Sequence, residues 1–300
     1  MSARTLFALV VTVTLWGSAF AAIRQALHGY PAGELALLRF AIASLCLAAY
    51  GLLKGLRLPL RRDLPLLFAC GLLGIAVYHV ALNQGETTVA AGPACFVINT
   101  SPVFSAILAR LFLGERLRAW GWAGIAVSFT GVALIGAGEG GGMRLEPGVA
   151  LILLAALSSA AYFVLQKPLL ARYGALEITS YTIWAGTVLL LVFAPGLAPR
   201  LVSSPASATL AAVYLGIFPA AVAYFTWTYL LARLPVTRAA SLLYTIPVLA
   251  AFFAWVWLGE RPSALTAIGG VVVLAGVVAV NTLGRVSGAC EASRVTTVRP

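Results

Sequence analysis

The stretch TSPVFSAILARLFLGER, residues 100–116, returns 145 residues later as TIPVLAAFFAWVWLGER, residues 245–261. When the comparison is extended to residues 95–135 and 240–280 without a gap, 14 of 41 positions are identical. So many identities far exceed chance for two apolar segments. The chain therefore contains a duplication, and repeats of this kind indicate how the whole fold is organised.

Weaker similarity extends the duplication toward both ends of the chain. Residues 15–20 align with residues 157–162, and Glu34 aligns with Glu177, at a slightly different offset. We therefore expect a first repeat over residues 1–140 and a second over residues 147–284.

The composition places both repeats in a membrane. The chain has 300 residues, of which 61% are hydrophobic and 10% charged, and its mean hydropathy is +0.99, whereas soluble domains carry roughly a quarter charged residues. A span needs about 20 apolar residues, and continuous apolar runs exclude the alternating strands of an outer-membrane barrel. We predict an all-α integral membrane protein with ten transmembrane helices. They are expected at residues 6–26, 33–53, 64–84, 92–113, 119–137, 148–167, 176–196, 207–231, 236–258 and 264–283.

The positive charges predict the orientation of these spans. With the N-terminus inside, the inner segments hold 14 Lys and Arg residues and the outer loops hold only Arg144, Arg200 and Arg261. This bias predicts a cytoplasmic N-terminus and a cytoplasmic C-terminus. The charges are too scattered for a nucleic-acid site. The first apolar run is too long for a cleaved signal peptide, and the polar tail at 285–300 is expected to be disordered.

An odd number of spans in each repeat makes the second copy enter the membrane upside down. Inverted repeats of this kind are typical of secondary transporters that work by alternating access. Twelve residues separate Pro102 and Pro247 from their Gly-Glu-Arg signals, which is about 18 Å along a helix and close to the midplane. We expect both prolines to be hinges beside a central site, the alternative being that each only kinks a packed helix.

Several motifs carry a resemblance to a known family. Trp16-Gly17-Ser18, Leu38-Arg39-Phe40 and the paired Pro and Gly-Glu-Arg signals resemble the EamA family of the drug/metabolite transporter superfamily. The pair Tyr78-His79 and the length are similar to the YddG-type bacterial exporters of aromatic and other amino acids.

The resemblance implies two EamA-type five-helix repeats around a central cavity lined by the first, third, fourth, sixth, eighth and ninth spans. The fifth and tenth spans would be peripheral. Their small residues, including Gly124 and Gly276, suit close packing, so a monomer and a homodimer formed through these two spans both stay open.

His79 is the histidine expected inside a span, and intramembrane ionisable groups are candidates for function. Asn83 lies one turn on and Tyr78 is adjacent, while the repeat maps His79 onto Tyr224 near Trp227. We expect the two clusters to line opposite ends of one path. The alternative is a buried structural histidine.

Aromatic and amide side chains on other spans complete the predicted site. Asn99 and Tyr244 occupy equivalent positions one turn before the two prolines. Arg24, Arg39 and Arg110 are interpreted as structural, because such side chains can extend to the membrane surface or pair, for instance with Glu34 or Glu86. The predicted substrate-binding residues are Trp16, Phe20, Tyr78, His79, Asn83, Asn99, Tyr162, Tyr224, Trp227 and Tyr244.

These features predict a bacterial inner-membrane transporter that exports amino acids and similar small solutes. No carboxylate lies near the midplane, which disfavours cation/proton antiport and leaves His79 as a candidate proton carrier. The cysteines have no ligand spacing, so we expect no metal or cofactor. Export of other amphiphilic metabolites or drugs, a channel role and a lipid-modifying enzyme are the alternatives. The enzyme is disfavoured because His79 has no Cys, Asp or Glu within a helical turn.

Overall fold

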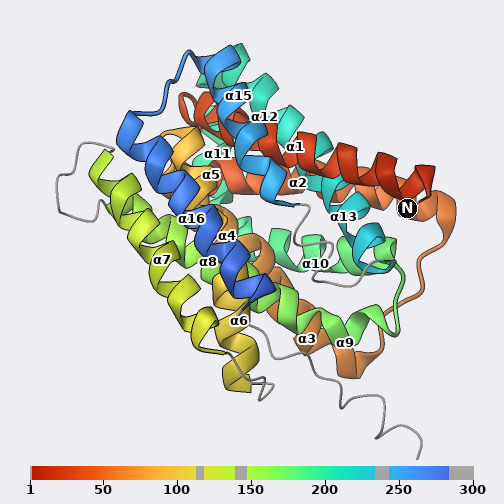
Figure 1. Ribbon diagram of the computed structural model, residues 1–300. Coiled ribbons are helices and arrows are strands. Elements are labelled where there is room, and N and C mark those ends of the chain that lie inside the picture. The colour runs from red at the N-terminus through yellow and green to blue at the C-terminus, as the bar shows by residue number, and fades with distance from the viewer. Residues whose placement is uncertain (1, 113–117, 139–146, 234–242, 284–300) are drawn as a thin grey trace, which may run out of the picture.

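The computed structural model describes residues 2–112, 118–138, 147–233 and 243–283, and within these ranges the chain is helical with no strand (Figure 1). The first repeat contains α1 (Ala3–Leu27), α2 (Ala32–Lys54), η1 (Arg61–Asp63), α3 (Leu64–Gly71), η2 (Leu72–Val77), α4 (Tyr78–Gly85), α5 (Ala91–Ile98), α6 (Ser101–Phe112) and α7 (Ala119–Gly136). The second contains α8 (Pro147–Leu165), α9 (Lys167–Leu170), α10 (Ala175–Leu190), η4 (Leu191–Phe193), α11 (Ala194–Ser203), α12 (Ala206–Leu215), η5 (Gly216–Val222), α13 (Ala223–Leu231), η6 (Leu243–Thr245), α15 (Ile246–Leu258) and α16 (Ala264–Thr282).

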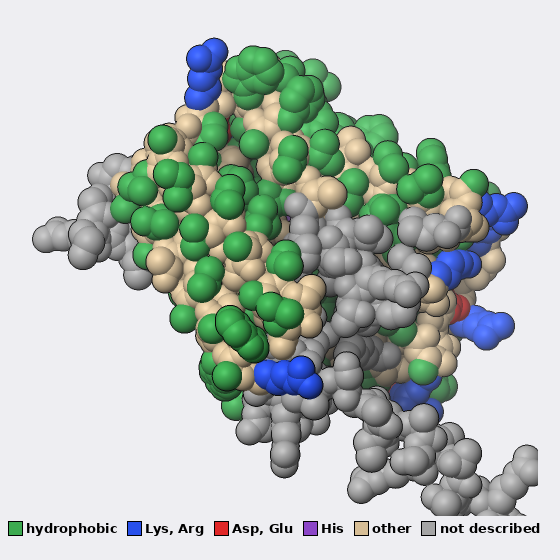
Figure 2. Space-filling model, viewed as in Figure 1, with side chains coloured by type: hydrophobic (Ala, Val, Ile, Leu, Met, Phe, Trp, Pro, Cys, Tyr) green, Lys and Arg blue, Asp and Glu red, His purple; other side chains and the backbone are tan. Residues whose placement is uncertain are grey.

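The described parts of the ten predicted spans are helical, and the fourth span is divided between α5 and α6. Six runs are long and apolar enough to cross a membrane, and α7, α15 and α16 are shorter apolar helices. The ninth span begins in a part of the chain outside the described residues, as does the predicted disordered tail. Figure 2 shows a face covered largely by hydrophobic side chains, with Lys and Arg side chains near its edges. The protein is therefore an all-α integral membrane protein.

The packing of α7 against α16 shows that the two repeats are inverted. The 145-residue offset makes Gly124 equivalent to Gly269, and Gly131 equivalent to Gly276. In the structure Gly124 faces Gly276 and Gly131 faces Gly269, so close that a Cβ on either partner would lie 2.6–2.8 Å from the opposite carbonyl oxygen. The two helices run antiparallel side by side (Figure 1). This exchange of equivalent partners is what a two-fold axis produces.

The small residues of α7 and α16 therefore meet within one chain. Ser128 Oγ adds a hydrogen bond of 3.3 Å to the carbonyl oxygen of Val273. The faces that remain exposed carry large side chains such as Trp120, Ile268 and Val271. A homodimer through these two helices stays a prediction, and it would have to use those apolar faces instead of the glycines.

Both prolines lie in the first turn of an α-helix that begins at a break in the α-helical structure, which is a turn at residues 99–100 before α6 and a 3₁₀ segment before α15. The helix α5 ends at Ile98 and α6 begins at Ser101, so Pro102 is the second residue of a new helix. Likewise η6 ends at Thr245 and Pro247 is the second residue of α15. A proline in the first turn costs no hydrogen bond, because those N–H groups have no partner inside the helix. The breaks lie where the sequence predicted weak points, and the hinge role itself stays a prediction.

Replacing Gly276 by alanine should destabilise the protein by about 1–3 kcal/mol, the usual cost of overpacking a filled interior. The added methyl group would lie 2.6 Å from the backbone oxygen of Gly124, which cannot move aside easily. Thermal unfolding in detergent measures the effect. Gly92→Ala is the matched control, since its new Cβ would approach nothing closer than 4.0 Å. Equal melting temperatures for the two variants would contradict the described packing.

Candidate functional site

The centre of the molecule is built on two π-helical segments at equivalent positions. The segment η2 interrupts the third span at Leu72–Val77, and η5 interrupts the eighth span at Gly216–Val222. The 145-residue offset maps residues 72–77 onto residues 217–222, so the two segments correspond. Such wide turns within helices are rare and occur frequently at functional sites.

The two π-helical segments supply backbone acceptors to side chains of other helices. Trp16 on α1 donates from Nε1 to the carbonyl oxygen of Pro219, at 3.3 Å. Its equivalent, Ser158 on α8, donates from Oγ to the carbonyl oxygen of Leu73, at 2.8 Å. The same type of contact is therefore made twice, once by each repeat.

His79 and Tyr224 follow these segments and contact each other directly. His79 Nε2 lies 3.0 Å from Tyr224 Oη, and the tyrosine hydroxyl also donates to the carbonyl oxygen of Gly74, at 3.3 Å. Equivalent residues related by a two-fold axis can touch only where that axis passes. The expectation that they line opposite ends of one path is therefore wrong, because both lie in one cluster at the centre.

Aromatic rings surround the His79–Tyr224 pair on several sides. The rings of Phe40 and Tyr78 each lie with their centroids 4.5 Å from that of His79. Trp16 packs against Tyr224 at 5.6 Å and against Trp227 at 5.4 Å. The contacts combine the imidazole of His79 and the phenols of Tyr78 and Tyr224 with apolar rings from the first, second and eighth spans.

Tyr162 is joined to this group indirectly. Its ring contacts that of Phe163, which in turn packs 5.9 Å from Trp227. A Cβ at Gly74 would meet the Tyr162 ring at 2.6 Å, so the glycine in η2 is what admits the tyrosine.

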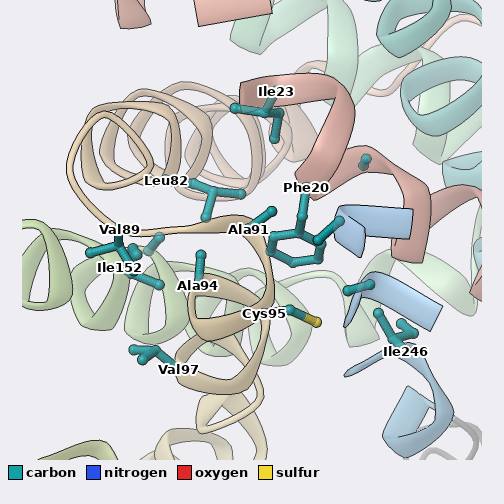
Figure 3. Close-up of a cluster of buried hydrophobic side chains, with 14 of the residues drawn as sticks. Phe20, Ile23, Leu82, Val89, Ala91, Ala94, Cys95, Val97, Ile152 and Ile246 are labelled. Carbon is teal, nitrogen blue, oxygen red and sulfur yellow. The ribbon is translucent and has the colours of Figure 1, made fainter. Parts of the chain in front are cut away.

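Other predicted site residues lie elsewhere or use their polar groups locally. Phe20 packs in a buried hydrophobic cluster with Cys95, Ala91 and Ile246 (Figure 3). Asn99 donates from Nδ2 to the carbonyl oxygen of Cys95 at 2.8 Å, which caps its own helix. The structure therefore does not bring these two side chains into contact with His79.

The remaining two predicted residues are Asn83 and Tyr244. Asn83 is buried one turn beyond His79 and donates from Nδ2 to the carbonyl oxygen of Ala32, at 3.0 Å. Tyr244 belongs to η6, and the placement of its side chain lies outside the described part of the structure.

Sequence reasoning missed the contribution of α2. The implied cavity excluded the second span, yet Phe40 on α2 stacks on His79 and also packs 6.4 Å from Tyr224. The available signal was the motif Leu38-Arg39-Phe40, which was used only for the family resemblance. Trp184 forms a hydrogen bond with α2, because its Nε1 donates to the carbonyl oxygen of Ser44 at 3.2 Å.

A group of polar contacts ties helices together at one end of the bundle, which we name the Glu260 end. Glu260 Oε1 lies 3.1 Å from Arg24 Nε, and Glu260 Oε2 accepts from the backbone N–H of Ala91 at 3.0 Å. Arg24 Nη1 also donates to the backbone oxygen of Glu86, at 2.7 Å. Arg24 is therefore paired with Glu260, whereas Glu34 and Glu86 were the examples of a partner considered from the sequence. Glu260 is the better partner because it also satisfies the first N–H group of α5.

The opposite end of the bundle is tied across the two repeats by different residues. Asp63 accepts from Arg172 Nη1 and from the hydroxyl of Tyr173, at 2.7 Å for the tyrosine. The backbone N–H of Arg57 donates to Glu177 Oε1 at 3.1 Å. Each end of the bundle thus has its own set of contacts between segments distant in sequence.

Comparisons with known proteins assign this arrangement to a family. The family model for EamA-like transporters matches residues 3–137 and again 146–282. The chain belongs to the EamA-like transporter family. It is therefore a membrane protein of the drug/metabolite transporter fold, with ten helices in two inverted five-helix repeats.

Individual EamA relatives are similar over almost the whole chain. A probable terminal-alkyne amino-acid exporter of Streptantibioticus cattleyicolor is 43% identical over 94% of this chain and 95% of its own. An uncharacterized transporter of Bacillus subtilis is 41% identical over 88% of this chain and 87% of its own. One crystal structure, 24% identical, covers 94% of this chain and 98% of its own with a TM-score of 0.64, and it shows the common fold.

Replacing Tyr224 by phenylalanine should destabilise this EamA-like protein by about 1–3 kcal/mol, because the change leaves the buried His79 Nε2 without its partner. Chemical or thermal unfolding in detergent measures the difference. Tyr50→Phe is the control, since Tyr50 is exposed and its hydroxyl makes no hydrogen bond with the described residues. If both variants unfold like the unaltered protein, the His79–Tyr224 hydrogen bond has no energetic importance.

Proposed function

We propose that this protein is a secondary transporter that exports amino acids, aromatic ones included, and related small metabolites. The observation that carries the proposal is the hydrogen-bonded His79–Tyr224 pair on the axis between the inverted repeats, with aromatic rings around it. A site on that axis keeps its place when the two repeats exchange their packing, which is the condition for alternating access.

The contacts at the two ends of the bundle support this mechanism. Arg24 and Glu260 retain side-chain exposures of 30% and 21%, and partly exposed ion pairs contribute at most about 1 kcal/mol. Contacts this weak can break in one state of the cycle and form again in the other. Pro102 and Pro247, each beside a helix break, are the proposed hinges for that change.

The character of the rings favours amino acids with apolar or aromatic side chains. Flat apolar surfaces combined with few polar groups bind solutes that have one polar and one apolar part. The Streptantibioticus cattleyicolor relative is named a probable terminal-alkyne amino-acid exporter, and an Escherichia coli relative, 26% identical, is named a probable amino-acid metabolite efflux pump. Specificity like that of the YddG-type aromatic exporters is part of this proposal.

Export of other amphiphilic metabolites or drugs is the second candidate, because the same aromatic surfaces would accept them. A lipid-modifying enzyme has less support. Among the described residues the polar contact of the His79 ring is Tyr224, and its other ring neighbours are Phe40 and Tyr78, so no acid, base or nucleophile pair is assembled there.

Counterflow in proteoliposomes tests the function. Purified protein should exchange radiolabelled phenylalanine against internal amino acids with saturation kinetics, and His79→Gln should reduce the rate at least tenfold. Tyr50→Phe is again the control that should leave the rate unchanged. No exchange above empty vesicles for any amino acid would exclude the proposal, and exchange of a drug alone would establish the second candidate.

The proposed orientation in the bacterial inner membrane places both termini in the cytoplasm. We therefore expect a cysteine at position 261 to react with a membrane-impermeant maleimide in intact cells, and a cysteine at position 57 to react only in inverted vesicles. Both positions are exposed in the structure. Cys290 is replaced by serine in each variant, to remove the native thiol predicted to lie outside the spans. The reverse labelling pattern would show that the orientation is inverted.

A further inference from the structure

Two residues of opposite charge, Arg39 on α2 and Glu86 at the end of α4, are buried and have side-chain atoms without a hydrogen-bond partner. Arg39 is 2% exposed, and its Nε and Nη1 have no partner. Glu86 is 0% exposed, and neither carboxylate oxygen has one. Arg24 is the cation that acts most strongly on the Glu86 carboxyl group, Arg39 acts on it more weakly, and no ion pair joins Arg39 to Glu86. An uncompensated buried charge is costly, and more so in a membrane.

Arg39 is adjacent to the proposed substrate site, and Glu86 lies seven residues beyond His79 at the end of α4. The Arg39 guanidinium carbon lies 5.2 Å from the ring centroid of Phe40, the residue that stacks on His79. The side chain of a helical residue leans toward the N-terminus of its helix, which for α2 is the Glu260 end.

The facing side of the third span presents further unsatisfied groups. His79, Asn83 and Glu86 are spaced by four and three residues and so lie along one helix face. His79 Nδ1 and Asn83 Oδ1 are buried and have no hydrogen-bond partner, like the Glu86 oxygens. Unsatisfied polar groups therefore follow one another along this helix face, from His79 toward the Glu260 end. Arg39 on α2 supplies the positive charge, and Glu86 supplies the negative charge beyond Asn83.

The second repeat shows whether the helical framework itself requires charged residues at these positions. The repeat offsets make Arg39 equivalent to Thr182, Asn83 to Thr228 and Glu86 to Leu231. In that half Thr228 is satisfied locally, because its Oγ1 donates to the carbonyl oxygen of Tyr224 at 2.8 Å. The same helical scaffold therefore forms without either charge, so the fold does not explain why Arg39 and Glu86 are charged.

We propose that Arg39 binds the α-carboxylate, and Glu86 the α-ammonium group, of a zwitterionic amino acid whose side chain lies against the aromatic rings. This inference rests on the proposed function. A guanidinium matches a carboxylate through two parallel hydrogen bonds, and Glu86 offers two free acceptor oxygens to an ammonium group. A zwitterion offers a group of opposite charge to both Arg39 and Glu86, whereas a simple amine or a simple acid offers one to only one of them.

The binding of three related ligands tests the proposal directly. They are phenylalanine, phenylalanine amide, which lacks the carboxylate, and 3-phenylpropionate, which lacks the ammonium group. Dissociation constants are measured by calorimetry on purified protein. The unaltered protein should bind phenylalanine at least tenfold more tightly than either analogue, since each charged hydrogen-bonded contact is worth about tenfold to a hundredfold in affinity.

Two substitutions should then change selectivity in opposite ways. Arg39→Thr, the residue type of the other repeat, should abolish the preference for phenylalanine over its amide while keeping the preference over 3-phenylpropionate. Glu86→Gln should do the reverse. Thr182→Val, at the position equivalent to Arg39, is the matched control and should keep both preferences. Melting temperatures of all variants confirm that the proteins are folded.

The outcomes separate this inference from the function on which it rests. An equal loss of affinity for all three ligands in Arg39→Thr or Glu86→Gln would assign the residue a structural role and overturn the inference. So would an unaltered protein that binds the three ligands equally well while it exchanges amino acids by counterflow. An unaltered protein that exchanges no amino acid would instead overturn the proposed function.

Discussion

The structure depends on a two-fold relation that brings the same position of both repeats into contact. His79 Nε2 and Tyr224 Oη, 145 residues apart, share a hydrogen bond of 3.0 Å where the axis passes. The glycines of α7 and α16 exchange partners in the same manner at the periphery. Because lipid cannot satisfy a polar group, the shared interior is where the imidazole of His79 and the phenol of Tyr224 can satisfy each other. The two-fold relation thus determines where the repeats contact each other, and with it where the polar side chains of His79 and Tyr224 lie.

Most of the helical framework could be predicted from the sequence. Runs of about 20 apolar residues, separated by charged or Gly- and Pro-containing loops, place α1, α2 and α8 within a few residues of their observed bounds. The repeat offset also predicted the correct equivalence of His79 and Tyr224. It could not show that they touch, because an offset relates positions in the sequence and does not place the axis in space.

The site itself was predicted less completely, for a physical reason. A span that is apolar on all sides has no polar face to distinguish from an apolar one. The sequence pattern therefore does not show which side of the helix faces the interior of the protein. Trp16 and Trp227 do contact the central pair or its rings, but Phe20 packs in the core and Asn99 caps its own helix. Phe40 was missed for the same reason. Arg39 was interpreted as structural because the sequence does not show that its guanidinium is buried with unpartnered nitrogens.

The two π-helical segments lie at matching positions, which bears on how the two repeats arose. A π-helical turn arises when one residue is added to an α-helix, since its hydrogen bonds span five residues instead of four. The segments η2 and η5 lie at corresponding positions of the two halves. One insertion made before the gene segment was duplicated accounts for both, whereas two later insertions would have had to fall at the same place. A single five-helix unit with such a wide turn could form the central contact only by pairing with a second copy inserted in the opposite orientation.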